Sequence, residues 1–332
     1  MDRLTRRRLE FKGNEMKIAD LTEKKWFQKY RPVDMDDIIL ELSVKKEVQG
    51  FIDSGDIPHL LFTGSPGLGK TALAAVIARA IGADVLFINA SAKRGIDVIR
   101  SEITQYCSVR SLDGSPKIVH LDEADRLTPE AQDALRPIME EFSKYTTFIL
   151  TANQRDRISE ALKSRCLSID LNPKDKVEAI RSVCKRCVEI LENEKVEYDK
   201  KAILQIVKYK FPDMRSVMNE LQRAVSTGKV DMDAAEHAKA SSLEALFDIL
   251  SEKKFMKMTE WVVENVPDAE SFIIRLWEEC FNRLERSSLP EAALILDEAQ
   301  DTVIPAPDKH LKVIATLTKI MRDCKVAPKT GE

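Results

Sequence analysis

The chain has 332 residues, of which 44% are apolar and 32% are charged, and its formal net charge is −3. This length and composition are those of a soluble globular protein with two or three domains, and they exclude a largely disordered chain. The sequence contains no run of about 20 apolar residues and no secretory signal at its N-terminus, so we expect a cytoplasmic protein without a membrane span. A net charge near zero also gives no overall basic surface for nucleic acid.

The first 24 residues are interpreted as a basic leader. The opening stretch, MDRLTRRRLEFKGNE, carries five Lys and Arg residues and precedes a second methionine, Met16. A basic tail is suited to nucleic acid, but a disordered extension or an upstream start codon is the simpler interpretation.

From about residue 59 to residue 171, short β-rich runs alternate with helical stretches. The runs are HLLFT, VLFIN, KIVHLD, TTFILT and LSIDL. Their alternation with helices is typical of a parallel five-stranded sheet covered by helices on both faces. The rest of the chain reads as helical, with one helical segment beginning just after Pro173. We place domain boundaries near residues 171 and 240.

The six cysteines and four histidines show no regular framework. Cys184 and Cys187 form a C-x-x-C, which is a spacing found in zinc sites. They lie, however, in an apolar helical stripe that runs from Val177 to Leu191, and no second Cys or His pair lies nearby in the sequence. We interpret both cysteines as core residues and predict no metal cluster.

Residues 64–71, GSPGLGKT, match G-x-x-x-x-G-K-[ST] between a strand-like and a helix-like run, which is the context of a phosphate-binding loop. Its glycines let backbone N–H groups converge on a phosphate at a helix N-terminus. Lys70 is expected to reach the β- and γ-phosphates, and the Thr71 hydroxyl to ligate Mg²⁺. The expected cradle consists of Pro66, Gly67, Leu68, Gly69, Lys70, Thr71 and Ala72. The stretch therefore predicts a site for ATP and Mg²⁺.

A second element, KIVHLDEADRL, brings two acids to the carboxyl end of a strand, where ligands of open α/β sheets bind. Asp122 is expected to hold Mg²⁺ and Glu123 to polarise the attacking water. An acidic pair alone is weak evidence, but together with the cradle upstream it indicates hydrolysis. The tetrapeptide DEAD also occurs in helicases; we reject that interpretation because the chain has one recognisable motor core.

The motifs KYRP, GSPGLGKT, LDEAD, LTAN, LKSRC and FPDMRSV occur in this order. Together they resemble the AAA+ clamp-loader family, whose members load sliding clamps onto primed DNA. The order of motifs looks most like the large ATPase subunit of T-even-type phage loaders, while INASAKRGIDVIR is similar to archaeal and eukaryotic replication factor C small subunits. The resemblance implies a P-loop AAA+ domain at 25–171, a helical lid at 172–240 and an all-α collar for oligomerisation at 241–332.

The resemblance also implies roles for single residues. Arg165 would be an arginine finger that acts in trans on a neighbouring subunit's ATP, Arg215 would contact ATP in its own subunit, and Asn153 would sense the γ-phosphate. The residues expected to border the adenine are Phe27, Tyr30 and Ile39. A surface salt bridge is the alternative for each arginine, and simple packing is the alternative for Tyr30.

DNA contacts are expected at a local basic cluster. Lys93 and Arg94 precede a helix that starts near Ile96, and Arg100 lies one turn further, an arrangement suited to phosphate oxygens. Solvated surface charge is the alternative. By family analogy, Arg136 would link DNA binding to Glu123.

The partners implied by the resemblance are other copies of the chain and a second clamp-loader subunit in a pentameric ring or spiral, a sliding clamp, and primer-template DNA without sequence specificity. The expected compartment is the cytoplasm, that of the host if a phage encodes the chain.

Two alternative functions stay open. One is a non-hydrolysing scaffold subunit, although the catalytic elements are present. The better one is another AAA+ motor, for branch migration or protein remodelling, against which the SRC motif argues.

Overall fold

The computed structural model describes residues 25–92, 96–111, 114–226, 228–266 and 268–327. The predicted leader at 1–24 and the predicted DNA contacts Lys93 and Arg94 lie outside the described residues. Within these ranges no helix has the length and apolarity needed to cross a bilayer. Packing divides the chain into two units, Met1–Glu197 with Phe211–Gly228 and Tyr198–Lys210 with Lys229–Glu332. Each unit is described by itself, and the boundaries at 171 and 240 stay predictions.

The first unit is built on a parallel sheet with the strand order β2-β3-β4-β1-β5. The five predicted strands are confirmed as β1 (Leu60–Thr63), β2 (Asp84–Asn89), β3 (Lys117–Asp122), β4 (Thr146–Ala152) and β5 (Leu167–Asp170). Leu61 of β1 lies between Leu150 of β4 and Ser168 of β5. Because all five strands run in the same direction, their carboxyl ends meet at one edge of the sheet, which is where such sheets bind ligands.

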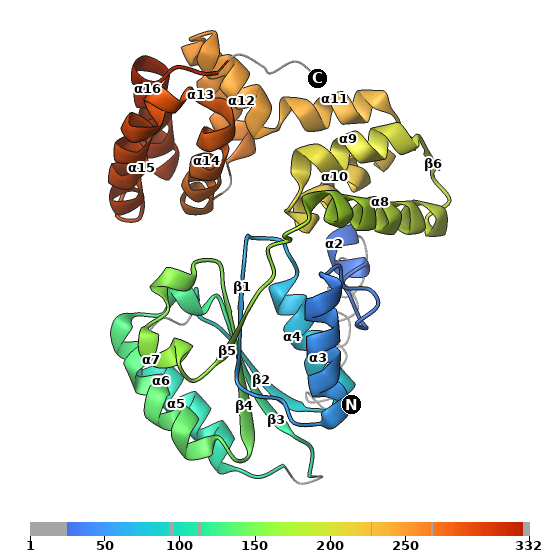
Figure 1. Ribbon diagram of the computed structural model, residues 1–332, viewed down its shortest axis with the longest axis vertical. Helices are drawn as coiled ribbons and strands as arrows, with labels where there is room; N and C mark the ends of the chain where they lie inside the picture. Colours follow the sequence, from blue (N-terminus) through green and yellow to red (C-terminus); the bar gives the residue numbers. More distant parts are fainter. Residues whose placement is uncertain (1–24, 93–95, 112–113, 227, 267, 328–332) are drawn as a thin grey trace, which may run out of the picture. The chain divides into compact units, whose positions relative to one another are not determined.

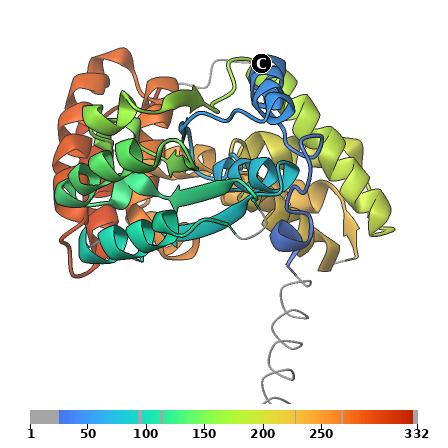
Figure 2. The same cartoon turned by 90° about the horizontal axis from the view of Figure 1, so that it is seen from below.

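Helices cover both faces of this sheet, as predicted (Figure 1). One layer contains α3 (Leu42–Ser54) and α4 (Lys70–Ala80), and the other contains α5 (Ile96–Ser108), α6 (Pro129–Phe142) and α7 (Glu160–Lys163). The same two layers are visible from below in Figure 2, blue on one side of the strands and teal to green on the other. Each face has its own core, because successive strand residues alternate: Leu60 and Phe62 pack with α4, whereas Leu61 packs with α6.

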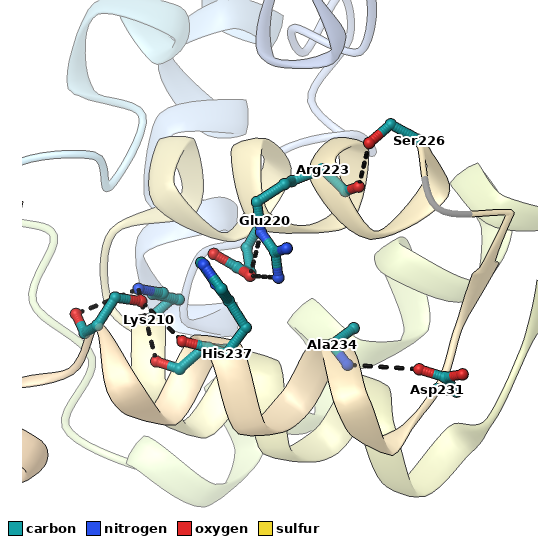
Figure 3. A network of polar contacts seen from close by, with 9 residues as sticks. Lys210, Glu220, Arg223, Ser226, Asp231, Ala234 and His237 are labelled. Carbon is teal, nitrogen blue, oxygen red and sulfur yellow. Dashed lines mark hydrogen bonds and ion pairs between the residues drawn. The ribbon is translucent and has the colours of Figure 1, made fainter. Parts of the chain in front are cut away.

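The first unit also contains α2 (Trp26–Lys29), two short 3₁₀ turns, η1 (Ala124–Arg126) and η2 (Arg155–Arg157), and the helices α8 (Lys176–Asn193) and α10 (Met214–Ser226). Asp175 caps α8 by accepting the N–H groups of Val177 and Glu178 at 2.9 and 3.0 Å, so the helix begins where its predicted start falls. On α10 the buried carboxylate of Glu220 accepts two hydrogen bonds from Arg223, one turn further along (Figure 3).

The predicted apolar stripe of α8 is correct in its centre and wrong at its start. Cys187 is fully buried and burial raises the pKa of its thiol, so it behaves as an apolar core residue. Cys184 is half-buried, and neither cysteine forms a disulfide. Val177, in contrast, is 69% exposed, because the core covers the helix only from its second turn onward.

The second unit is helical, as expected for the C-terminal part. Its helices are α9 (Lys200–Lys210), α11 (Met232–Ala240), α12 (Leu243–Ser251), α13 (Phe255–Asn265), α14 (Ala269–Arg283), α15 (Leu289–Val303) and α16 (Lys309–Asp323), with one 3₁₀ turn, η3 (Arg286–Ser288). Two short strands, β6 (Glu197–Tyr198) and β7 (Lys229–Val230), lie before α9 and before α11. Phe247, Phe272 and Leu317 are central to the core that α12–α16 share.

Candidate nucleotide site

A cavity of about 850 Å³ lies in the first unit at the carboxyl ends of β1, β3 and β4. Every residue predicted to touch the nucleotide or its metal from within the same chain lines this cavity. These residues are Phe27, Tyr30, Ile39, Pro66, Gly67, Leu68, Gly69, Lys70, Thr71, Ala72, Asp122, Glu123, Asn153 and Arg215. The fold therefore gathers segments that are up to 188 positions apart in the sequence, from Phe27 to Arg215, around one space.

The loop between β1 and α4 has the backbone of a phosphate cradle. Gly67 and Gly69 have φ angles of +81° and +86°, which favour glycine. A side chain at Gly67 would also collide with Asp213, which caps α10. Lys70 begins α4 and its Nζ donates to the carbonyls of Gly64 and Ser65 at 2.7 and 2.9 Å. The ammonium is thus held at the centre of the loop.

Burial lowers the pKa of Lys70 to about 8, against the opposing effect of the nearby Asp125, Asp122 and Glu123 carboxylates. Bound phosphates favour the charged ammonium, so above pH 8 the protein must take up a proton together with ATP. We expect the Kd for ATP to be nearly flat below pH 8 and to rise by up to about tenfold per pH unit above it. A titration with a fluorescent ATP analogue from pH 7 to 9.5 measures this.

The control for this titration is Lys70→Arg, because a guanidinium stays charged over the whole range. Its Kd should not change with pH. An equal rise in the arginine variant would mean that another group causes the pH dependence.

The acids at the end of β3 are held by hydroxyl groups. Thr71 Oγ1 donates to Asp122 Oδ1 at 2.6 Å, so a hydroxyl from α4 and a carboxylate from β3 converge as two hard oxygen donors. The carboxylate of Glu123 accepts a hydrogen bond from Ser91, which follows β2. Ser91 was not singled out from the sequence, and nothing in its local pattern distinguishes it from other loop serines.

Asn153 follows β4 and faces the cavity from the next strand. Its backbone N–H and that of Gln154 donate to the carboxylate of Asp125, at 3.3 Å each. Burial raises the pKa of Asp125, while these N–H donors oppose the shift. Thr151, the next-to-last residue of β4, also lines the cavity. Thr151 and Asp125 were missed at the sequence level, although a polar residue within the apolar run FILTA is a usable signal.

The opposite side of the cavity is formed by α2, α8 and α10. The Tyr30 hydroxyl donates to Glu194 Oε1 at 2.6 Å, and the same oxygen accepts a hydrogen bond from Lys29. The Arg215 guanidinium lies 5.8 Å from the centre of the Phe27 ring, within cation–π range. Of the residues predicted to contact the nucleotide from this side, Arg215 and Phe27 therefore lie against one another, and Tyr30 is bonded to the residue that caps the end of α8.

Three predicted residues lie elsewhere. Arg165 does not line the cavity; it follows α7 and hydrogen-bonds to Glu140 and, at 2.6 Å, to the carbonyl of Ala161. Arg100 in α5 and Arg136 in α6 are exposed. Arg136 does not line the cavity either and helps Arg165 to lower the pKa of Glu140, and its predicted link to Glu123 stays a prediction.

A P-loop between β1 and α4, acids that end β3 and a polar residue that ends the intervening strand β4 define a P-loop ATPase of the AAA+ class. Family models agree. Residues 60–173 match the ATPase family associated with various cellular activities. Residues 175–234 match the AAA+ ATPase lid domain of the sliding-clamp-loader large subunit.

Relatives that match nearly the whole chain identify the family within this class of ATPases. The replication factor C small subunit 2 of Pyrobaculum islandicum is 36% identical over 323 residues, which covers 92% of this chain and all of the relative. The replication factor C small subunit of Archaeoglobus fulgidus is 35% identical over 317 residues, which covers 89% of this chain and 98% of the relative. The chain belongs to the replication factor C small-subunit family and is a clamp-loader ATPase subunit of DNA replication.

Among solved structures, a mutant of Thermotoga maritima RuvB aligns with a TM-score of 0.56 and covers 86% of this chain and 91% of that one. A second, described as a Holliday junction branch migration motor, has a TM-score of 0.53 and covers 76% and 81%. Both are 18% identical, so they show a shared AAA+ fold and nothing about the substrate. The whole-chain relatives and the lid domain therefore favour the clamp-loader function over the branch-migration alternative.

Proposed function

We propose that the chain binds ATP together with Mg²⁺ in the cavity and couples hydrolysis to opening a sliding clamp and loading it onto primer-template DNA. The observation that carries the proposal is the convergence of Lys70, Thr71, Asp122, Glu123 and Asn153 on one cavity, with the half-buried Arg165 outside it. The cavity contains the lysine, the two acids and Asn153, but not the arginine proposed as the finger. Such a site is suited to completion by Arg165 of a neighbouring copy.

Each side chain then has one task. Lys70 binds the β- and γ-phosphates, and Thr71 and Asp122 hold Mg²⁺, which neutralises charge on the phosphates when bound. Their two converging oxygens fit this ion, because Mg²⁺ is usually held by one or two protein oxygens plus substrate phosphates. Glu123 accepts a proton from the attacking water, and Asn153 donates to the γ-phosphate. Arg165 of the next copy stabilises the charge that develops during transfer.

The DNA contacts are proposed at α5 and α6. Arg100 is exposed in the first turns of α5, and Arg136 is exposed on α6, which packs against α5. The far end of α5 is anchored, because the buried Lys117 donates to the carbonyl oxygens of Tyr106 and Val109. Contacts of this type to phosphates carry no sequence information, as the loading of clamps at any primed site requires.

We expect ATP turnover by the assembled complex to rise when both clamp and primer-template DNA are added. Steady-state ATPase assays with each component alone and with both measure this. A four-way junction is the matched control DNA, because a branch-migration motor should respond to the junction instead. A rate that neither clamp nor primed DNA changes would refute the loading function.

A further inference from the structure

Two buried side chains fasten the end of β3 to the end of β4. The Thr151 hydroxyl donates to Asp122 Oδ1 at 2.8 Å and accepts the backbone N–H of Glu123 at 3.0 Å. The Asp125 carboxylate accepts the N–H groups of Asn153 and Gln154. Thr151 is 1% exposed and Asp125 6%. We refer to Thr151 and Asp125 as the β3–β4 clasp.

The clasp holds Glu123 in an unusual backbone conformation. Glu123 has φ 56° and ψ 45°, in the left-handed region that side chains other than glycine rarely adopt. Such a conformation persists only where its surroundings impose it, and it clusters at functional sites. The N–H of Glu123 points to Thr151, and the 3₁₀ turn that follows Glu123 carries Asp125. The hydroxyl and the turn therefore fix the direction in which the glutamate leaves the strand.

The choice of threonine at this position is chemical rather than steric. The neighbouring β4 residues Phe148, Ile149, Leu150 and Ala152 are apolar and fully buried, and valine has nearly the shape of threonine. A buried hydroxyl is unfavourable unless it is hydrogen-bonded. The Thr151 hydroxyl donates its one proton to the Asp122 carboxylate and accepts the backbone N–H of Glu123. Both of its hydrogen bonds are therefore made to the two acids of the site.

We propose that Thr151 is a positioning residue for ATP hydrolysis, which together with Asp125 holds Glu123 and Asn153 in a fixed relation. The proposal rests on the proposed role of Glu123 as the residue that activates water. Thr151 acts through the N–H of Glu123 and the carboxylate of Asp122. Lys70, the cation of the phosphate cradle, is held instead by the carbonyls of Gly64 and Ser65. Loosening the clasp should therefore lower kcat and leave ATP binding intact.

The matched pair of variants is Thr151→Val and Thr151→Ser in the full chain. Valine keeps the shape and removes the hydroxyl, and we expect kcat to fall by about 10²-fold, the scale of a misplaced reacting group, with the Kd for ATP unchanged. Serine keeps the hydroxyl and removes a methyl group, and its kcat should stay within about threefold of the wild type. If Thr151 only packed the core, the order would be reversed.

A double-variant cycle separates this proposal from the proposed role of Glu123. Adding Thr151→Val to Glu123→Gln should cause no further loss of kcat, because both changes disable the same group. Full turnover by Glu123→Gln alone would refute the role of Glu123. An inactive Glu123→Gln beside a fully active Thr151→Val would refute only the clasp. If Thr151→Val does not fold, Asp125→Asn replaces it, and wild-type kcat in that variant would overturn the proposal.

Discussion

Replacing Lys70 with alanine should abolish measurable ATP turnover. Lys70 Nζ already lies at the centre of the loop, bonded to two loop carbonyls, and those bonds are the ones that phosphate oxygens would replace. Without the ammonium, charge on the β- and γ-phosphates is uncompensated, and we expect kcat/KM to fall by at least about 10³-fold. Steady-state ATPase assays and equilibrium ATP binding measure the loss.

The fold should survive this change. Lys70 is buried and its pKa is depressed, so its charged form is disfavoured by the folded state and the variant should melt no earlier than the wild type. Lys45→Ala is the matched control, since Lys45 lines the same cavity but pairs with Asp36 at 2.9 Å. Turnover by Lys70→Ala at the level of Lys45→Ala would contradict the cradle interpretation.

Replacing Arg165 with alanine should leave ATP binding intact and lower DNA- and clamp-stimulated turnover by about 10³-fold or more, the scale of arginine fingers. Arg165 does not line the cavity of its own chain, so binding there does not depend on it. It is tied to Glu140 by an ion pair at the surface, and such pairs are weak because water screens them. The guanidinium can therefore exchange Glu140 for the phosphate of a neighbouring site.

Complexes that mix wild-type and variant copies test whether Arg165 acts in trans. The defect should appear in the site next to the Arg165→Ala copy, which can be located by giving that neighbour a nucleotide-binding variant. A defect confined to the copy that carries the substitution would exclude action in trans. Arg181→Ala is the control, because Arg181 is an arginine that forms a more exposed ion pair, with Glu178, at the surface.

Much of the fold follows from local patterns. The strands are recognisable because apolar runs such as HLLFT are buried on both faces and bounded by turns, and the cradle because its donors are consecutive backbone groups. The start of α8 was mispredicted at Val177, since helical periodicity identifies a face but not how far the core extends along it. Thr151 and Ser91 were missed because their partners lie 28 to 32 residues away.

The sequence by itself determined the class of site, because GSPGLGKT carries the phosphate donors, the cation and a hydroxyl within eight residues. Only the tertiary structure decided which other polar groups face that loop. In the strand order β2-β3-β4-β1-β5, β4 lies between β1, which precedes the phosphate-binding loop, and β3, which carries the two acids at its end. Parallel pairing then sets Thr151 and Asn153 beside Asp122 and Glu123, and it leaves Arg165 outside. The physical reason is that backbone cradles form from neighbours in the chain, whereas strand ends meet only when the sheet assembles.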